Sequence, residues 1–149
     1  YTPKIFEPPY LPESVMNTPF NCLNSSNWPC KEVSEDLFYL LVETDPFVIA
    51  NRFWTILSKL SEIINQLAVN MGINPDEAEI GFEVLFKYLL CIVFAFGVSE
   101  ILEVMTFSAE FYDFIDDNSE QQYAMTHFLG LVKYITTMDV NELTKNAQS

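Results

Sequence analysis

The stretch over residues 80–105, IGFEVLFKYLLCIVFAFGVSEILEVM, constrains the fold of this chain more than any other feature. Wound into a helix, it is apolar on more than one face. A helix on a protein surface needs only a single apolar stripe, whereas a helix that is apolar on nearly all sides is buried by its neighbours. The stretch therefore predicts a central helix that is surrounded by other helices or shares one face with a second molecule.

Charged residues at the edges of this stretch argue against a membrane span. A transmembrane helix needs about 20 nearly uncharged residues. The uncharged run here covers residues 88–99, because Lys87, Glu100 and Glu103 border it. We therefore expect the helix to lie inside a protein core, and we predict no membrane partner.

The composition of the chain limits its partners further. Half of its 149 residues are hydrophobic, far more than in a disordered chain. Twenty-one acidic residues against seven basic ones give a net charge of −14. Nucleic-acid binding needs a basic surface, so we expect no nucleic-acid partner. Copies of the chain should repel one another at neutral pH, and acid should weaken that repulsion.

The rest of the chain predicts four further helices and no strand. Pro29 and the pair Asp45-Pro46 are typical of helix starts, since an aspartate caps the first turn and proline is tolerated in it. These signals and the apolar periodicity predict helices over residues 27–43, 46–71, 75–105, 109–117 and 120–137. The predicted fold class is all-α, with a five-helix bundle over residues 28–138.

The two ends of the chain lie outside the predicted bundle. Five of the eight prolines fall within residues 1–27, and proline cannot continue a helix. This segment is predicted to be an extended, Pro-rich N-terminal arm. Residues 139–149 are predicted to form a polar tail or linker.

Several residues near the first helix indicate a compartment. Trp28 is the expected core anchor at the start of that helix. The three cysteines lack the spacing and the histidines of a zinc site, so no metal is predicted. Cys30 and Cys91 could link the first helix to the central one, and Cys22 with Cys30 is the alternative disulfide. Asn24 begins an N-glycosylation sequon. A disulfide and a sequon together are typical of a secreted protein.

The sequence contains no motif for catalysis or for cofactor binding. It lacks a glycine-rich phosphate loop, a nucleophile elbow and a metal-spaced carboxylate motif. The only histidine, His127, lies in an apolar helix, where a core or rim position is the usual one. We therefore expect neither an enzyme nor a cofactor. Glu100 and Glu103 stand out instead, because they project from an otherwise apolar helix and a carboxyl group is easier to bury once protonated.

Three segments resemble the N-terminal domains of spidroins, the spider silk proteins. The segment 28–35, WPCKEVSE, looks like the opening of their first helix, and the segment 57–64, LSKLSEII, is similar to their second-helix pattern. The segment 94–101, FAFGVSEI, resembles Phe-Ala-Ser-Ser-Met-Ala-Glu-Ile in their third helix. The order and spacing of the five helices agree over about residues 27–137.

This resemblance implies a secreted structural protein of the silk-gland lumen. Such domains stay monomeric at neutral pH and form antiparallel homodimers as the pH falls, so the implied partner is a second copy of the chain. Glu100 matches a family carboxylate that takes up a proton on dimerisation. The implied pH-sensing and dimer-interface residues are Glu100, Glu103, Lys87, Phe94, Val98 and Ile101.

A second interpretation belongs to a different functional class. A helical binding module would hold a partner helix or an apolar ligand in a groove along the central helix. Residues 94–97, FAFG, resemble part of the central helix of Bcl-2-like viral apoptosis regulators. Acid-dependent dimerisation would favour the silk interpretation, whereas binding of a helical peptide by a monomer at neutral pH would favour the binding module.

Overall fold

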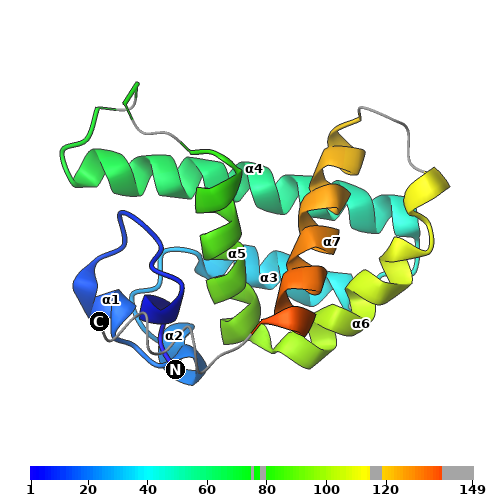
Figure 1. Cartoon of the computed structure of the whole chain (residues 1–149), viewed down its shortest axis with the longest axis horizontal. Coiled ribbons are helices and arrows are strands. Elements are labelled where there is room, and N and C mark those ends of the chain that lie inside the picture. Colours follow the sequence, from blue (N-terminus) through cyan, green and yellow to red (C-terminus); the bar gives the residue numbers. More distant parts are fainter. Residues whose placement is uncertain (75, 78–79, 115–118, 139–149) are drawn as a thin grey trace.

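A computed structural model describes residues 1–74, 76, 77, 80–114 and 119–138. All regular structure in these ranges is helical, which confirms the all-α fold class. The elements in chain order are η1 (Pro3–Ile5), α1 (Glu13–Met16), α2 (Phe20–Leu23), α3 (Lys31–Leu40), α4 (Pro46–Asn70), α5 (Phe82–Phe96), α6 (Val98–Ala109), η2 (Tyr112–Phe114) and α7 (Glu120–Thr137). Figure 1 shows η1, α1 and α2 to one side of α5 and the helices α6 and α7 to the other.

The longest helix, α4, has 25 residues, and its sequence fixes where it starts. The Asp45 carboxylate accepts a hydrogen bond from the Phe47 N–H at 2.9 Å, and Pro46 occupies the first helical position. Such a cap stabilises a helix by about 1 kcal/mol. The apolar face of α4 packs against α7, where Phe53 and Phe128 stack with ring centroids 4.0 Å apart.

A buried carboxylate joins α3 to α4. Asp36 is 6 % exposed, and its carboxylate lies 2.8 Å from the Lys59 Nζ and 3.9 Å from the Arg52 guanidinium. The hydrogen bond to Asp36 raises the pKa of Lys59. A carboxylate in a core needs such partners, because an unpaired buried charge is strongly destabilising. These contacts hold α3 along the first half of α4.

The predicted helix over residues 75–105 is wrong in its start and in its continuity. α5 begins at Phe82, and the chain then bends by 120° between α5 and α6. Gly97, at the bend, has a φ of +131°, which residues with a Cβ atom rarely adopt. A glycine therefore divides one apolar stretch into two helices that run in different directions.

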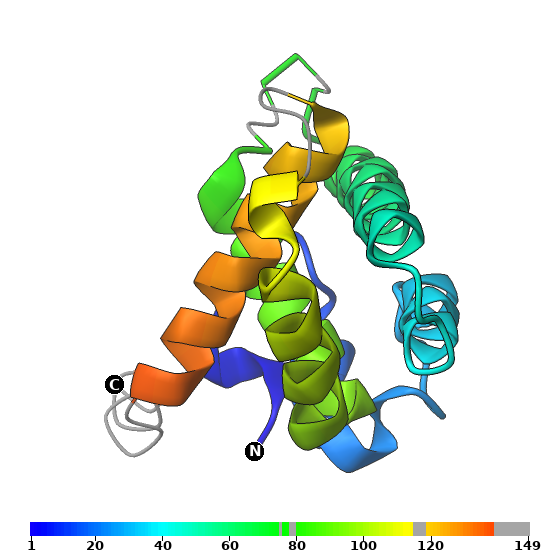
Figure 2. The ribbon, with the colours of Figure 1, turned by 90° about the vertical axis from the view of Figure 1, so that its right-hand side faces the viewer.

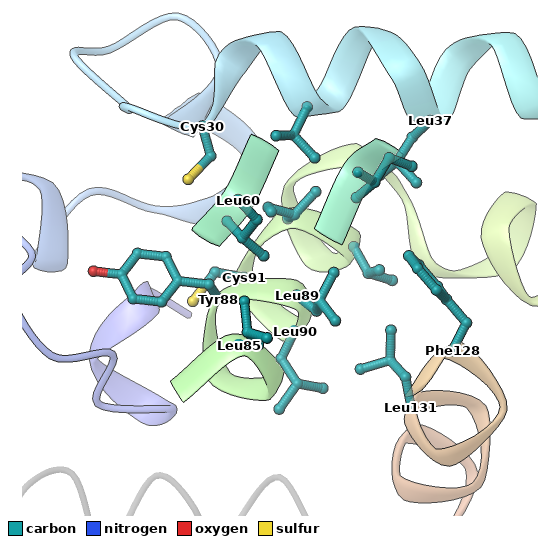
Figure 3. Packing of buried hydrophobic residues seen from close by; sticks show 14 of the residues in the cluster. Cys30, Leu37, Leu60, Leu85, Tyr88, Leu89, Leu90, Cys91, Phe128 and Leu131 are labelled. Carbon is teal, nitrogen blue, oxygen red and sulfur yellow. The ribbon is translucent and has the colours of Figure 1, made fainter. Parts of the chain in front are cut away.

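The helix at the centre of the core is α5 alone. Its buried side chains are Leu85, Tyr88, Leu89, Leu90, Cys91, Ile92 and Val93. Trp28 is 2 % exposed and stacks on Tyr88, with ring centroids 6.4 Å apart and planes 17° from parallel. Figure 3 shows Leu89 and Leu90 in the same core as Phe128 and Leu131 of α7. The core thus joins Trp28, which precedes α3, and the helix α7 to α5.

Residues 1–27 do not form the predicted extended arm. Proline residues open its short helices, with Pro3 in the first turn of η1 and Pro12 and Pro19 directly before α1 and α2. The segment also buries six large apolar side chains, which are Ile5, Phe6, Leu11, Val15, Phe20 and Leu23. The prolines prevent a long helix, but the apolar residues between them gain more by packing on the core than by staying in water.

This N-terminal segment covers one face of α5. The rings of Phe6 and Phe20 pack on Phe94, with centroids 5.2 and 5.4 Å from it. The Tyr88 hydroxyl donates a hydrogen bond to the Pro9 carbonyl. Together these contacts close the side of α5 that the other long helices leave open.

The predicted five-helix bundle over residues 28–138 is not confirmed. The described residues hold seven α-helices, and two of these are the single turns α1 and α2. The predicted helix over residues 109–117 is replaced by the end of α6 and by the short η2, as far as the described residues reach. The predicted tail, residues 139–149, lies outside the described residues.

Candidate functional site

A groove opens between α6 and the turn that joins α3 to α4. It encloses about 460 Å³, within the roughly 300–1,000 Å³ that ligand pockets occupy. Its lining residues are Leu40, Leu41, Glu43, Thr44, Ile49, Glu100, Glu103, Val104 and Phe107. We call it the α6 groove. Figure 2 shows α6 with α7 on one side of the molecule and α3 with α4 on the other.

Apolar side chains form the floor and part of the rim of the α6 groove. Leu40 and Ile49 are each 1 % exposed and belong to the core beneath it. Leu41 and Phe107 are 38 % and 41 % exposed and stand at its edge. Further large apolar side chains around the α3–α4 turn are exposed to water, namely Phe38, Tyr39, Val42, Phe47 and Val48. Apolar side chains exposed in a cluster, rather than singly, mark interaction surfaces.

Three carboxylates stand at the same groove. Glu43 accepts hydrogen bonds from the N–H groups of Thr44 and Asp45, at 3.0 and 3.1 Å. Glu100 accepts one from the Ser99 hydroxyl at 3.2 Å. The ion pairs within the described residues involve the carboxylates of Asp36 and Glu83, so no lysine or arginine there neutralises the groove acids. The α6 groove therefore carries uncompensated negative charge.

Local structure places two of these acids. Glu100 lies in the first turn of α6, where the helix dipole stabilises a negative charge. Its carboxylate folds back over Gly97, within 2.6 Å of where a Cβ atom on that residue would stand. Glu103, Val104 and Phe107 follow Glu100 at helical spacings of three, four and seven residues, so all four share one face of α6. That face changes from acidic at the start of α6 to apolar towards its end.

Three of the other predicted dimer-interface residues, Ile101, Phe94 and Lys87, do not line the α6 groove. Ile101 is 1 % exposed and lies in the core. Phe94 is half-buried under Phe6 and Phe20, and Lys87 on α5 forms an ion pair with Glu83 at 3.5 Å. The side chain of Val98 lies outside the described residues. The bend at Gly97 separates residues that one continuous helix would have aligned, and it leaves Glu100 and Glu103 together at the groove.

Sequence reasoning missed the partner wall of the groove, which the α3–α4 turn supplies. Leu41 belongs to the run 37–42, LFYLLV, which is apolar on every side of a helix, and Glu43 follows directly after it. A run that α3 alone cannot bury is the signal that could have drawn attention to this turn.

The cysteines are free thiols, and neither predicted disulfide is formed in the structure. Cys22 is exposed, whereas Cys30 and Cys91 are both fully buried near Tyr88 (Figure 3). Burial raises the pKa of both buried thiols and of the Tyr88 hydroxyl. A buried thiol with a raised pKa is chemically inert, so these two cysteines act as core residues.

The sequon residue Asn24 is exposed but engaged by its neighbours. Its Nδ2 donates a hydrogen bond to the Ala95 carbonyl at 3.3 Å, and its Oδ1 accepts one from the Ser34 hydroxyl at 3.4 Å. A second hollow of about 380 Å³ lies beside it, and Lys31 and Glu35 contribute opposite charges there. The mixed charge and the bonded Asn24 side chain make this hollow a weaker candidate than the α6 groove.

His127 belongs to α7, is buried in the protein and does not line the α6 groove. It is 3 % exposed, its Nδ1 lies 3.0 Å from the Tyr123 carbonyl, and its ring contacts those of Phe82 and Tyr123. Its Nε2 is buried and has no hydrogen-bond partner among the residues that the structure describes. Across the described ranges, no set of three histidine, cysteine or acidic side chains is placed to hold a metal ion, and the three groove acids are no exception.

None of the described helices is by itself both long and apolar enough to cross a bilayer. α5 and α6 reach the necessary length and composition only as a pair, and that pair is bent by 120°.

Comparisons with known proteins add no relative to this description. No protein-family model, no curated protein and no solved structure matches the chain.

Proposed function

We propose that this chain is a non-enzymatic, helical protein-interaction domain that binds a partner helix in the α6 groove. One observation carries the proposal: the groove combines exposed apolar side chains with carboxylates that have no cationic partner among the described residues. A groove of this kind accepts the apolar face of an amphipathic helix, whose anchors recur every three to four residues.

The proposed site differs from the groove that the sequence predicted along the central helix. The face of α5 around Phe94 is already covered by Phe6 and Phe20, so no partner can reach it without displacing residues 1–27. In the described part of the chain, no such cover lies over Val104 and Phe107 of α6. A partner therefore binds after the bend at Gly97 rather than along α5.

Peptide binding to the full chain tests the proposal. The probe is an 18-residue amphipathic peptide of leucine and glutamine, with leucines at helical spacing and no net charge. We expect it to shift NMR signals of α6 and of the α3–α4 turn at pH 7. Phe107→Ala should weaken binding severalfold. Val69→Ala, near the far end of α4, is the matched control because Val69 is 40 % exposed, and it should have no effect. Signal shifts confined to other helices would refute the proposed site.

Acid-dependent self-association of a secreted, silk-type protein is the second candidate. It is supported by Glu100 and Glu103 lying beside exposed apolar side chains on a chain of net charge −14. Two copies meeting at their grooves would bring six carboxylates together, and protonation would remove the repulsion. Sedimentation at pH 7.5 and 5.5 tests it. A monomer at both values would rule it out, and a dimer at pH 5.5 that Glu100→Gln with Glu103→Gln promotes at pH 7.5 would support it.

A further inference from the structure

We infer that the α6 groove selects a basic amphipathic helix, with apolar anchors that enter between Val104 and Ile49 and lysines or arginines that meet Glu43, Glu100 and Glu103. The inference rests on the proposed function and names the chemistry of the partner. It draws on the ionic state of the groove, on the order of residues along α6 and on the net charge of the chain.

The acids of the α6 groove have no cationic partner among the described residues. The cations that form ion pairs in the described part of the chain are used elsewhere, Arg52 and Lys59 on Asp36 and Lys87 on Glu83. The Glu103 side chain is exposed, and its carboxylate makes no hydrogen bond or ion pair with another described residue. A bound helix that covers these acids removes water from them, and a carboxylate that loses water needs a positive partner.

The order of residues along α6 sets the layout of the partner. Glu100 and Glu103 occupy the first half of the helix face, and Val104 and Phe107 occupy the second half. A helix lying against this face meets negative charge near Gly97 and apolar surface near Phe107. Its basic residues are therefore expected at one end of the contact and its large apolar anchors at the other.

The net charge disfavours the other occupants. An acidic helix would place like charges against the rim, and this repulsion opposes binding. A second copy of this chain also carries −14 and is repelled at neutral pH. A basic helix is attracted to the acidic groove by electrostatic forces, which dissolved salt screens. Its affinity for the groove should therefore fall as the ionic strength rises.

Three peptides of 18 residues test the inference on the full chain at pH 7. They share the same leucine positions, and their polar positions hold lysine, glutamine or glutamate. We expect the leucine–lysine peptide to bind at least about tenfold more tightly than the leucine–glutamine peptide, and the leucine–glutamate peptide to bind most weakly. Isothermal titration at low and at physiological salt gives the dissociation constants.

Charge-matched variants separate the groove from the overall charge of the protein. The double variant Glu100→Gln with Glu103→Gln should lose most of the preference for lysine over glutamine. The control is Glu13→Gln with Glu62→Gln, which removes two exposed acids from α1 and α4 and changes the net charge equally. The control should keep the preference. Thermal unfolding of both double variants checks that each still folds.

The outcomes distinguish failure of the inference about charge from failure of the proposed function. If the lysine and glutamine peptides bind the groove equally, the inference about charge is wrong and the proposed function stands. If both double variants lose the preference to the same extent, general attraction to an acidic protein explains it and the inference is again wrong. If none of the three peptides binds at the α6 groove, both the inference and the proposed function fail.

Discussion

α5 and α6 are consecutive parts of one apolar stretch, yet the fold covers them very differently. Seven side chains of α5 are buried, and residues 1–27 cover its face around Phe94, although Phe82 at the start of the helix is 52 % exposed. α6 buries Ile101 and Met105 but leaves Val104 and Phe107 at an open groove. Residues of the same chain therefore bury most of α5, whereas the apolar face of α6 at Val104 and Phe107 lines an open groove.

The charges on the two helices follow the same division. On α5, Lys87 and Glu83 neutralise each other across one turn. On α6, Glu100 and Glu103 have no cationic partner among the described residues. Unpaired charge beside an uncovered apolar surface is what a binding site needs, because both features are satisfied only when a partner arrives. The contrast in cover and charge between α5 and α6 therefore supports a binding function for the α6 groove.

The largest expected effect on stability comes from a change in the covered core around α5. Trp28→Ala should destabilise the protein by about 3–5 kcal/mol, because it removes a buried ring that stacks on Tyr88. Denaturant unfolding followed by far-UV circular dichroism measures the loss. A loss below about 1 kcal/mol would mean that the α5 side is not the core that we describe.

The next test concerns the bend itself. Gly97→Ala should destabilise the protein by about 1–3 kcal/mol, because a residue with a Cβ atom is strained at a φ of +131°. The Glu100 carboxylate would also have to move, but it is the end of a flexible side chain. Gly130→Ala in α7 is the matched control. A Cβ atom there meets nothing within 4 Å, so this change should stabilise the helix by up to about 1 kcal/mol. Equal effects of the two changes would show that the bend does not depend on Gly97.

Alkaline pH should weaken the covered side through its buried thiols. Burial raises the pKa of Cys30 and Cys91 above that of an exposed thiol, about 8.5. The unfolded chain then loses these protons first, so stability is fully present below about pH 8.5 and falls as the pH rises above it. Lys59, whose pKa is also raised, adds a loss of the same sign at higher pH.

Thiol labelling checks the same arrangement at neutral pH. One cysteine, Cys22, should react with a thiol reagent in the native protein, and Cys30 and Cys91 should react only on unfolding. Replacing both buried cysteines by alanine should flatten the loss of stability between pH 8 and 10. Rapid labelling of all three thiols at pH 7 would contradict the burial on which this expectation rests.

Caps and prolines in the sequence predicted the features that depend only on neighbouring residues, such as where a helix starts. The start of α4 follows from the Asp45 cap and Pro46. The start of α7 at residue 120 was also predicted, but its cap was not: the Ser119 hydroxyl accepts a hydrogen bond from the Gln122 N–H. The end of α5 does not follow in this way. Gly97 lies within an apolar run whose periodicity continues through it, so the pattern does not show that this glycine adopts a φ of +131° and ends the helix.

The candidate site was predicted in part for the same reason. Glu100 and Glu103 stand out from the sequence because they are acids on an apolar helix. Their neighbours at the groove, Leu41 and Glu43, come from a turn about 60 residues earlier, and no sequence spacing relates the two regions. The segment over residues 1–27 was misjudged because its prolines exclude a long helix but not a packed one.

The smallest expected effect on stability belongs to the groove, and it sharpens the comparison from the other side. Phe107 is 41 % exposed, and its ring packs on that of Phe111 with centroids 5.3 Å apart. Phe107→Ala should therefore cost less than about 1 kcal/mol in denaturant unfolding, as surface changes usually do. The same variant should bind the leucine–glutamine peptide severalfold more weakly, because the exposed ring forms part of the binding surface. A residue that matters for binding and hardly for folding is the signature of a functional surface. A loss above about 3 kcal/mol would instead place Phe107 in the core, and the contrast between α5 and α6 would then disappear.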